Sequence, residues 1–205
     1  MRPEQYRQLV HFGGFLFIIL AQLIDKHAMA LYFILLSVFF LAYSEYAGRG
    51  ARTLGPLSRI EKKIRDVALM LERGTKRPFM GAFWFYLSLG AVFLLFPLHI
   101  ASAAGAMLAI GDALSTAIGI RFGKRRISGK KTLEGSSAFF AGSFFAGALF
   151  VGYTLAAFAA AFATFIELLP SARPLKRLAE KQIVDDNWMI PVFTATFMAL
   201  LYYAA

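Results

Sequence analysis

The chain has 205 residues, of which 59% are hydrophobic and only 17% charged, and its formal net charge is +10 at pH 7. This composition argues against a soluble domain and is typical of a protein with several membrane-spanning helices. The lack of cysteine excludes disulfides and thiolate metal sites. We expect one all-α, multi-pass integral-membrane domain over residues 1–205, with no nucleic-acid partner.

Apolar runs of about 17–20 residues, the length that crosses a bilayer, recur along the chain. The first begins at Leu9. Because no small-residue cleavage site follows it, we interpret it as a retained helix and not as a signal peptide. The sequence predicts a bundle of about seven spans, which are residues 8–24, 28–47, 79–96, 98–120, 135–152, 153–169 and 188–204. The fifth and sixth are rich in Gly, Ala and Ser, so we expect them to pack inside the bundle.

The connection over residues 48–78 is long enough to contain an element of its own. From Pro56 to Arg73, apolar residues recur at steps of three and four between charged residues. This pattern predicts an amphipathic helix in the cytoplasmic interface of the membrane.

Basic residues are distributed unevenly. Apart from Lys26, every Lys and Arg lies before residue 8 or in residues 48–78, 121–134 and 170–187. Seven spans place all these segments on one side of the membrane. By the positive-inside rule that side is the cytoplasm, and the N-terminus lies there.

Several polar residues stand near the cytoplasmic ends of the predicted spans. Asp112 is the deepest of the acids, Glu45 and Glu167 lie nearer the ends of their spans, and Asp186 stands directly before the last span. Carboxylates faced by many Lys and Arg are suited to a divalent cation with a polyphosphate. A simpler alternative is that Asp112 pairs with an arginine of a connection. His11, one turn inside the first span, could equally act in catalysis or bond to a neighbouring helix.

The stretch GDALSTAIGIRFGKRRISGKKTLEG, residues 111–135, is not a P-loop, because its glycines are one residue too close and Arg125 replaces the required Ser or Thr. It resembles the nucleotide-binding signature of the CTP-dependent lipid kinases, the family of dolichol kinase, CTP-dependent diacylglycerol kinase and phytol kinase. That signature reads D-x-x-A-x-x-x-G-x-x-x-G, a basic stretch, and K-K-T-x-E-G. Ser115 stands where the family usually has Ala. The matching residues are Asp112, Gly119, Gly123, Lys130, Lys131, Thr132, Glu134 and Gly135.

Two weaker resemblances flank the signature. RQLVH, residues 7–11, looks like the R-K-x-x-H that opens the family's first helix. The end of the sixth span at Glu167, followed by DDNWMIP, looks like the family's acidic helix end and its D-N-x-x-x-P, with matches at Asp186, Asn187 and Pro191.

The resemblance implies a CTP-dependent kinase that phosphorylates a lipid alcohol at the cytoplasmic face of the cell membrane, with Mg²⁺ or another divalent cation. We expect a polyisoprenoid substrate of the dolichol or polyprenol type. The implied metal ligands are Asp112, Glu134 and Asp186. Candidates for the catalytic base are Asp112, Glu167 and His11. The implied nucleotide-binding residues are Gly119, Gly123, Lys124, Gly129, Lys130, Lys131, Thr132, Glu134, Gly135 and Asn187.

Three alternatives stay open at this point. A diacylglycerol-type lipid kinase differs from the leading hypothesis only in its substrate. A cytidylyltransferase that forms a CDP-lipid would use the same nucleotide and metal. An ion-coupled transporter with acids in its path is a more remote alternative. The oligomeric state is also open, a homodimer included.

Overall fold

The computed structural model describes residues 13–48, 79–129, 131–172, 174–175, 178–179 and 184–204. The amphipathic helix predicted within residues 48–78 lies outside this part of the chain, as do His11 and Lys130. The described residues are almost entirely helical, which confirms the all-α expectation.

The helices coincide with the predicted apolar runs. Each of the seven predicted spans overlaps a helical segment, and the helix edges differ from the predicted ones by a few residues where both are described. The segments are residues 13–20, α2 (Lys26–Gly48), α4 (Met80–Leu95), α5 (Leu98–Phe122), α6 (Leu133–Val151), α7 (Tyr153–Leu168), continued by the 3-10 helix η2 (Leu169–Ser171), and α9 (Asp186–Ala204).

Four of these segments are long and apolar enough to cross a membrane: α2, α5, α6, and α7 together with η2. Helix α4 is apolar but has 16 residues, so it extends roughly 24 Å, less than the roughly 30 Å of a hydrocarbon core. Polar residues at both ends of α9 dilute its apolar character. Part of the first predicted span precedes the described residues.

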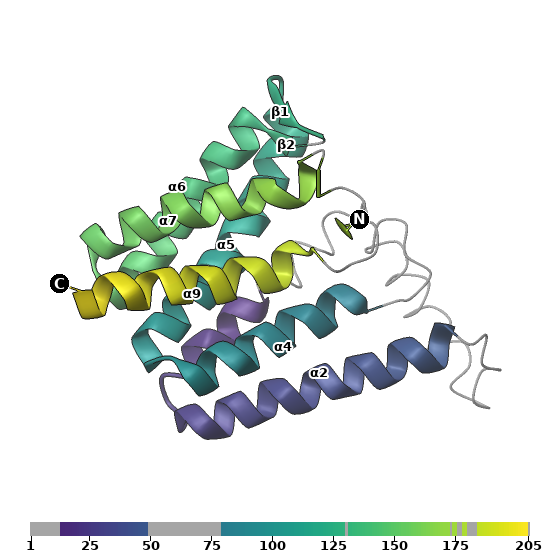
Figure 1. The fold of residues 1–205 in the computed structure, drawn as a ribbon, viewed down its shortest axis with the longest axis vertical. Helices are drawn as coiled ribbons and strands as arrows, with labels where there is room; N and C mark the ends of the chain where they lie inside the picture. Colours follow the sequence, from purple (N-terminus) through teal and green to yellow (C-terminus); the bar gives the residue numbers. More distant parts are fainter. Residues whose placement is uncertain are drawn as a thin grey trace.

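The helices form a bundle in which α5 is the central element (Figure 1). Helix α5 packs most extensively against α6, and α9 packs against α4, α5 and α7, while α2 packs against α4 at the edge. Residues 101–109 of α5 are buried without interruption. Figure 1 also shows that the strands β1 and β2, the end of α7 and the start of α9 lie on one side of the bundle, opposite the C-terminus.

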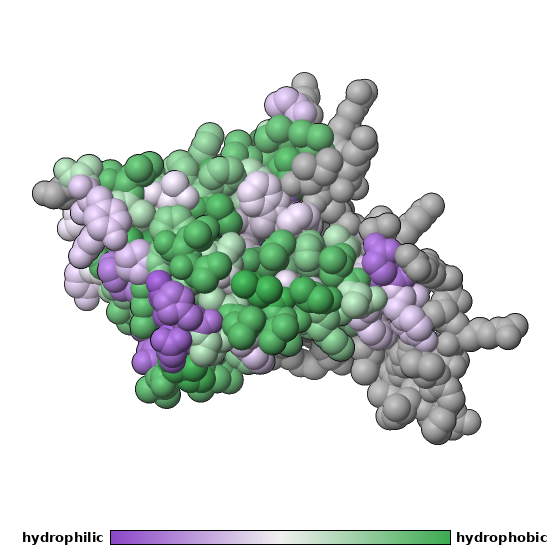
Figure 2. Space-filling model, turned by 60° about the horizontal axis from the view of Figure 1, so that its bottom comes forward, coloured by the Kyte–Doolittle hydropathy of each residue, from purple (hydrophilic) through white to green (hydrophobic). Residues whose placement is uncertain are grey.

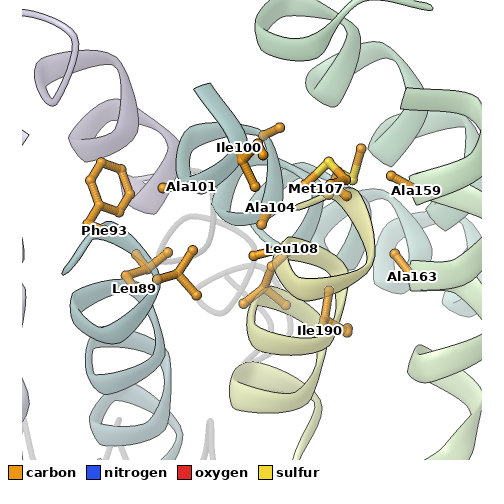
Figure 3. Packing of buried hydrophobic residues seen from close by; sticks show 14 of the residues in the cluster. Leu89, Phe93, Ile100, Ala101, Ala104, Met107, Leu108, Ala159, Ala163 and Ile190 are labelled. Carbon is orange, nitrogen blue, oxygen red and sulfur yellow. The ribbon is translucent and has the colours of Figure 1, made fainter. Parts of the chain in front are cut away.

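The core lies where α5 meets α4, α7 and α9. Small side chains such as Ala104 and Ala163 bring the backbones close, and Leu108 and Ile190 fill the space between them (Figure 3). Helices α6 and α7 present their small residues inward, as expected. However, they are less buried than α5, at 39% and 33% of the span against 61%, because their large side chains point outward.

The outer surface is strongly apolar. Figure 2 shows a broad hydrophobic face, with hydrophilic residues gathered toward its ends. Many exposed side chains are large and apolar, including Leu35 and Phe39 of α2 and Phe145 and Leu149 of α6. A surface of this kind is suited to contact with lipid acyl chains.

Candidate functional site at the hairpin end of the bundle

The basic segment after α5, expected only as a connection, folds into a small β-hairpin. Strand β1 (Arg126–Ser128) pairs antiparallel with β2 (Lys131–Thr132). Gly129 begins the turn with φ +54°, a left-handed conformation that suits glycine. The Ser128 hydroxyl donates to the carbonyl oxygen of Ser171 at 2.8 Å, which fastens the hairpin to η2. The hairpin therefore has a fixed position beside the end of α7.

The glycines of the signature allow the end of α5 to meet the start of α6. A Cβ added at Gly123 would lie 2.8 Å from Cγ2 of Thr132, and one at Gly135 would lie 3.1 Å from the carbonyl oxygen of Ser115. Gly119 is less crowded, since its added Cβ would lie 3.5 Å from Thr132 Oγ1. Thr132 is the N-cap of α6, and its hydroxyl accepts from the Gly135 N–H at 3.2 Å. These four predicted nucleotide-binding residues thus shape a close helix contact.

Glu134 is also engaged with the backbone. Its carboxylate accepts from the N–H groups of Lys124 at 3.1 Å and of Arg125 at 3.3 Å. These two hydrogen bonds hold the backbone just after α5, and the Lys124 side chain is exposed. A carboxylate with two backbone donors has fewer lone pairs for a cation, so Glu134 fits the expected role of metal ligand less well than the other two candidates.

Lys131 contacts two of the predicted acidic site residues, Glu167 and Asp186. Its Nζ lies 2.5 Å from Oε1 of Glu167 and 3.7 Å from Oδ2 of Asp186. The Ser115 hydroxyl donates to the same Glu167 oxygen at 3.2 Å. The lysine comes from β2, and its partners come from the end of α7, the start of α9 and the inner face of α5.

The acids of this cluster differ in burial. Glu167 has no exposed side-chain surface, Asp112 is 5% exposed, and the Asp186 side chain is 31% exposed. Burial lowers the pKa of the Lys131 ammonium, but the carboxylates of Asp186, Glu167 and Asp112 outweigh it, and the net shift is upward. Lys131 is therefore charged at neutral pH.

The start of α9 is held by its own side chains and by α4. The Asp185 carboxylate accepts from the Asn187 N–H at 2.9 Å, as an N-cap does. The Asn187 carbonyl oxygen accepts from the hydroxyl of Ser88 at 2.9 Å. Asp186 is in the first turn, where the helix dipole favours a negative charge. Asn187 follows directly on Asp186, the α9 residue that Lys131 contacts.

Within the described ranges, no three His, Cys, Asp or Glu side chains are close enough to form a metal site by themselves. Mg²⁺ commonly takes one or two carboxylates and completes its shell with phosphate and water. Three carboxylates act on one ammonium here, and Oε2 of Glu167 is buried with no hydrogen-bond partner in the described part of the chain. Asp112 and Asp186, two carboxylates that act on the same lysine, could supply the one or two ligands that Mg²⁺ takes from a protein.

Ser115 contacts Glu167 in the structure but is not among the site residues predicted from the sequence. A signal for it was available, because Asp112, Ser115 and Gly119 follow one another at steps of three and four. This spacing places them on one face of a helix. His11 and Lys130, which the sequence places in the site, lie outside the described residues.

Comparison with protein-family models, curated proteins and solved structures finds no match for this chain.

Proposed function

We propose that the chain is a CTP-dependent kinase that phosphorylates a polyisoprenoid lipid alcohol at the cytoplasmic face of the membrane. The observation that carries the proposal is the position of Lys131. A lysine from a basic hairpin reaches buried and half-buried carboxylates at one end of a bundle of apolar helices. Phosphoryl transfer depends mainly on positioning the reactants and neutralising the charge of the phosphates. For a membrane lipid, the residues that do this must lie near the edge of the hydrocarbon core.

The choice of CTP and of a dolichol- or polyprenol-like alcohol rests on the resemblance of residues 111–135 to the lipid-kinase signature. The cytoplasmic orientation rests on the positive-inside rule. Four helices able to cross a membrane and an apolar outer surface support an enzyme that takes its acceptor from the bilayer.

In this proposal the described residues divide the work. Asp112 and Asp186 are the better candidates to hold Mg²⁺, which when bound neutralises charge on the phosphates. Lys131, with Lys130 beside it in the sequence, contacts phosphate oxygens. Glu167 accepts the proton of the lipid hydroxyl, because its carboxylate is the most deeply buried of the three. Asn187 borders the nucleotide, together with the glycines Gly119, Gly123, Gly129 and Gly135.

The deciding experiment uses purified protein in detergent micelles with Mg²⁺ and CTP labelled at the γ-phosphate. A panel of polyprenol, diacylglycerol and phytol serves as acceptors. We expect label in the polyprenol, and a preference for diacylglycerol would change the substrate assignment. Label from the α-phosphate in the lipid would instead identify a cytidylyltransferase.

Two controls separate the remaining explanations. Asp112→Asn should abolish transfer, whereas Asp25→Asn should not, because Asp25 is exposed and lies before α2 at the far end of the bundle. No transfer from either phosphate to any lipid, together with ion flux into liposomes, would favour the transporter.

A further inference from the structure

The Glu167 carboxylate is held asymmetrically. Its Oε1 atom accepts from Lys131 at 2.5 Å and from the Ser115 hydroxyl at 3.2 Å. Its Oε2 atom is buried and accepts no hydrogen bond from the described residues. A buried polar atom without a hydrogen-bond partner destabilises the folded state, so the arrangement calls for a functional explanation.

A serine on a helix has a local alternative, since its hydroxyl can bond to the carbonyl four residues earlier. Ser37, Thr164 and Thr196 form such local bonds, at steps of three or four residues. Ser115 instead donates across the bundle to a residue 52 positions away. Ser115 is 7% exposed, so water contributes little to its hydrogen bonding. The bond therefore fixes the orientation of the carboxylate.

We propose that Ser115 is a positioning residue, which together with Lys131 holds Oε1 of Glu167 and leaves Oε2 to accept the proton of the lipid hydroxyl. This inference rests on the proposed kinase function. In the step, the lipid oxygen forms a bond to the γ-phosphorus of CTP as its proton passes to Oε2. The bond from the γ-phosphorus to the bridging oxygen breaks, and CDP leaves with the electron pair.

The test compares Ser115→Ala with Ser115→Thr, which keeps the hydroxyl, and with Ser143→Ala. Ser143 is a matched control, because it is fully buried and its hydroxyl donates to a backbone oxygen, the carbonyl of Met107, and not to a carboxylate. We expect Ser115→Ala to lower kcat by about 10- to 100-fold, with little change in KM for CTP. Ser115→Thr should recover much of kcat, and Ser143→Ala should retain it.

Three results would overturn the role of Ser115: a normal kcat in Ser115→Ala, an equal loss in Ser143→Ala, or an effect confined to KM for CTP. A second measurement does not need activity. Ser115→Ala should lower the unfolding midpoint in the wild-type background and have a smaller effect in Glu167→Met, which lacks the acceptor. Equal shifts in both backgrounds would contradict the contact itself. A wild-type protein that phosphorylates no lipid would overturn the proposed function, whatever the midpoints show.

Discussion

Lys131 Nζ and Glu167 Oε1 lie 2.5 Å apart, although 36 positions separate the two residues in the chain. Glu167 is at the C-terminal end of α7, where the helix dipole disfavours a carboxylate. It is also fully buried. The ammonium of Lys131 offsets both effects, so this ion pair connects the hairpin to the bundle and orders the candidate site.

Replacing Lys131 with Met should destabilise the protein, because it leaves a buried carboxylate without its cation. We expect a loss of roughly 1–3 kcal/mol, less than for a fully buried pair, since the Lys131 side chain is 23% exposed. Unfolding by denaturant in micelles measures the loss. Arg126→Met is the control, because Arg126 is an exposed cation of the same hairpin, and it should change the free energy of unfolding little. Equal losses in the two variants would contradict the structural role of the ion pair.

The stability that Lys131 contributes should depend on pH in one direction. Its pKa in the folded protein is raised above the ordinary value of 10.5. The contribution is therefore complete below 10.5 and is lost as the pH rises through the folded-state pKa. Without divalent cations, the difference in unfolding free energy between wild type and Lys131→Met should be the same at roughly pH 7 and pH 9, and smaller only beyond the ordinary pKa of lysine. A difference that already shrinks near neutral pH would contradict this.

Gly119 in α5 and Gly123, the C-cap of α5, should respond differently to alanine. At Gly123 the new Cβ would lie 2.8 Å from Thr132 and would also clash with the Gly119 carbonyl oxygen, so we expect a loss of about 1–3 kcal/mol. At Gly119 the nearest atoms are at 3.5 Å, and alanine should be neutral or stabilise the helix by up to about 1 kcal/mol. Thermal unfolding of both variants measures this contrast.

Gly119→Ala also separates packing from nucleotide binding. If the Gly119 backbone borders CTP, this stable variant should show a higher KM for CTP. A normal KM would assign Gly119 to helix packing alone.

Asp112→Asn keeps the volume of the side chain and removes its charge. If Asp112 holds the divalent cation, transfer of the γ-phosphate should fall by at least roughly 100-fold, while expression and the unfolding midpoint change little. Activity titrated with Mg²⁺ measures the effect. Near-normal turnover would show that the metal role is wrong.

Lys131→Ala removes both the proposed phosphate contact and the ion pair with Glu167, so its kinetics are measured under conditions where the variant is folded. Loss of a cation at the triphosphate should raise KM for CTP, and loss of the contact that holds Glu167 should lower kcat. Comparing it with Lys124→Ala is informative, because the Lys124 side chain is exposed and only its backbone N–H contacts Glu134. An unchanged dependence on CTP in Lys131→Ala would remove this residue from the phosphate site.

The sequence alone determined the helical character of the chain and the approximate limits of the apolar segments. Hydrophobicity over a run of residues is a local property, and the short stop signals such as Pro97 and Gly152 fall where helices end in the structure. The helical period also places Asp112 and Gly119 on one face of α5 without any knowledge of the fold.

Only the tertiary structure decided what these residues meet. Which carboxylates surround Lys131 depends on how the hairpin docks on η2 and how α7 and α9 pack against α5, and no local pattern contains that information. The same packing turns Gly123 and Gly135 into contact points and directs the Ser115 hydroxyl to Glu167. Ser115 therefore has a specific partner only because α5 and α7, which are distant in the sequence, pack together.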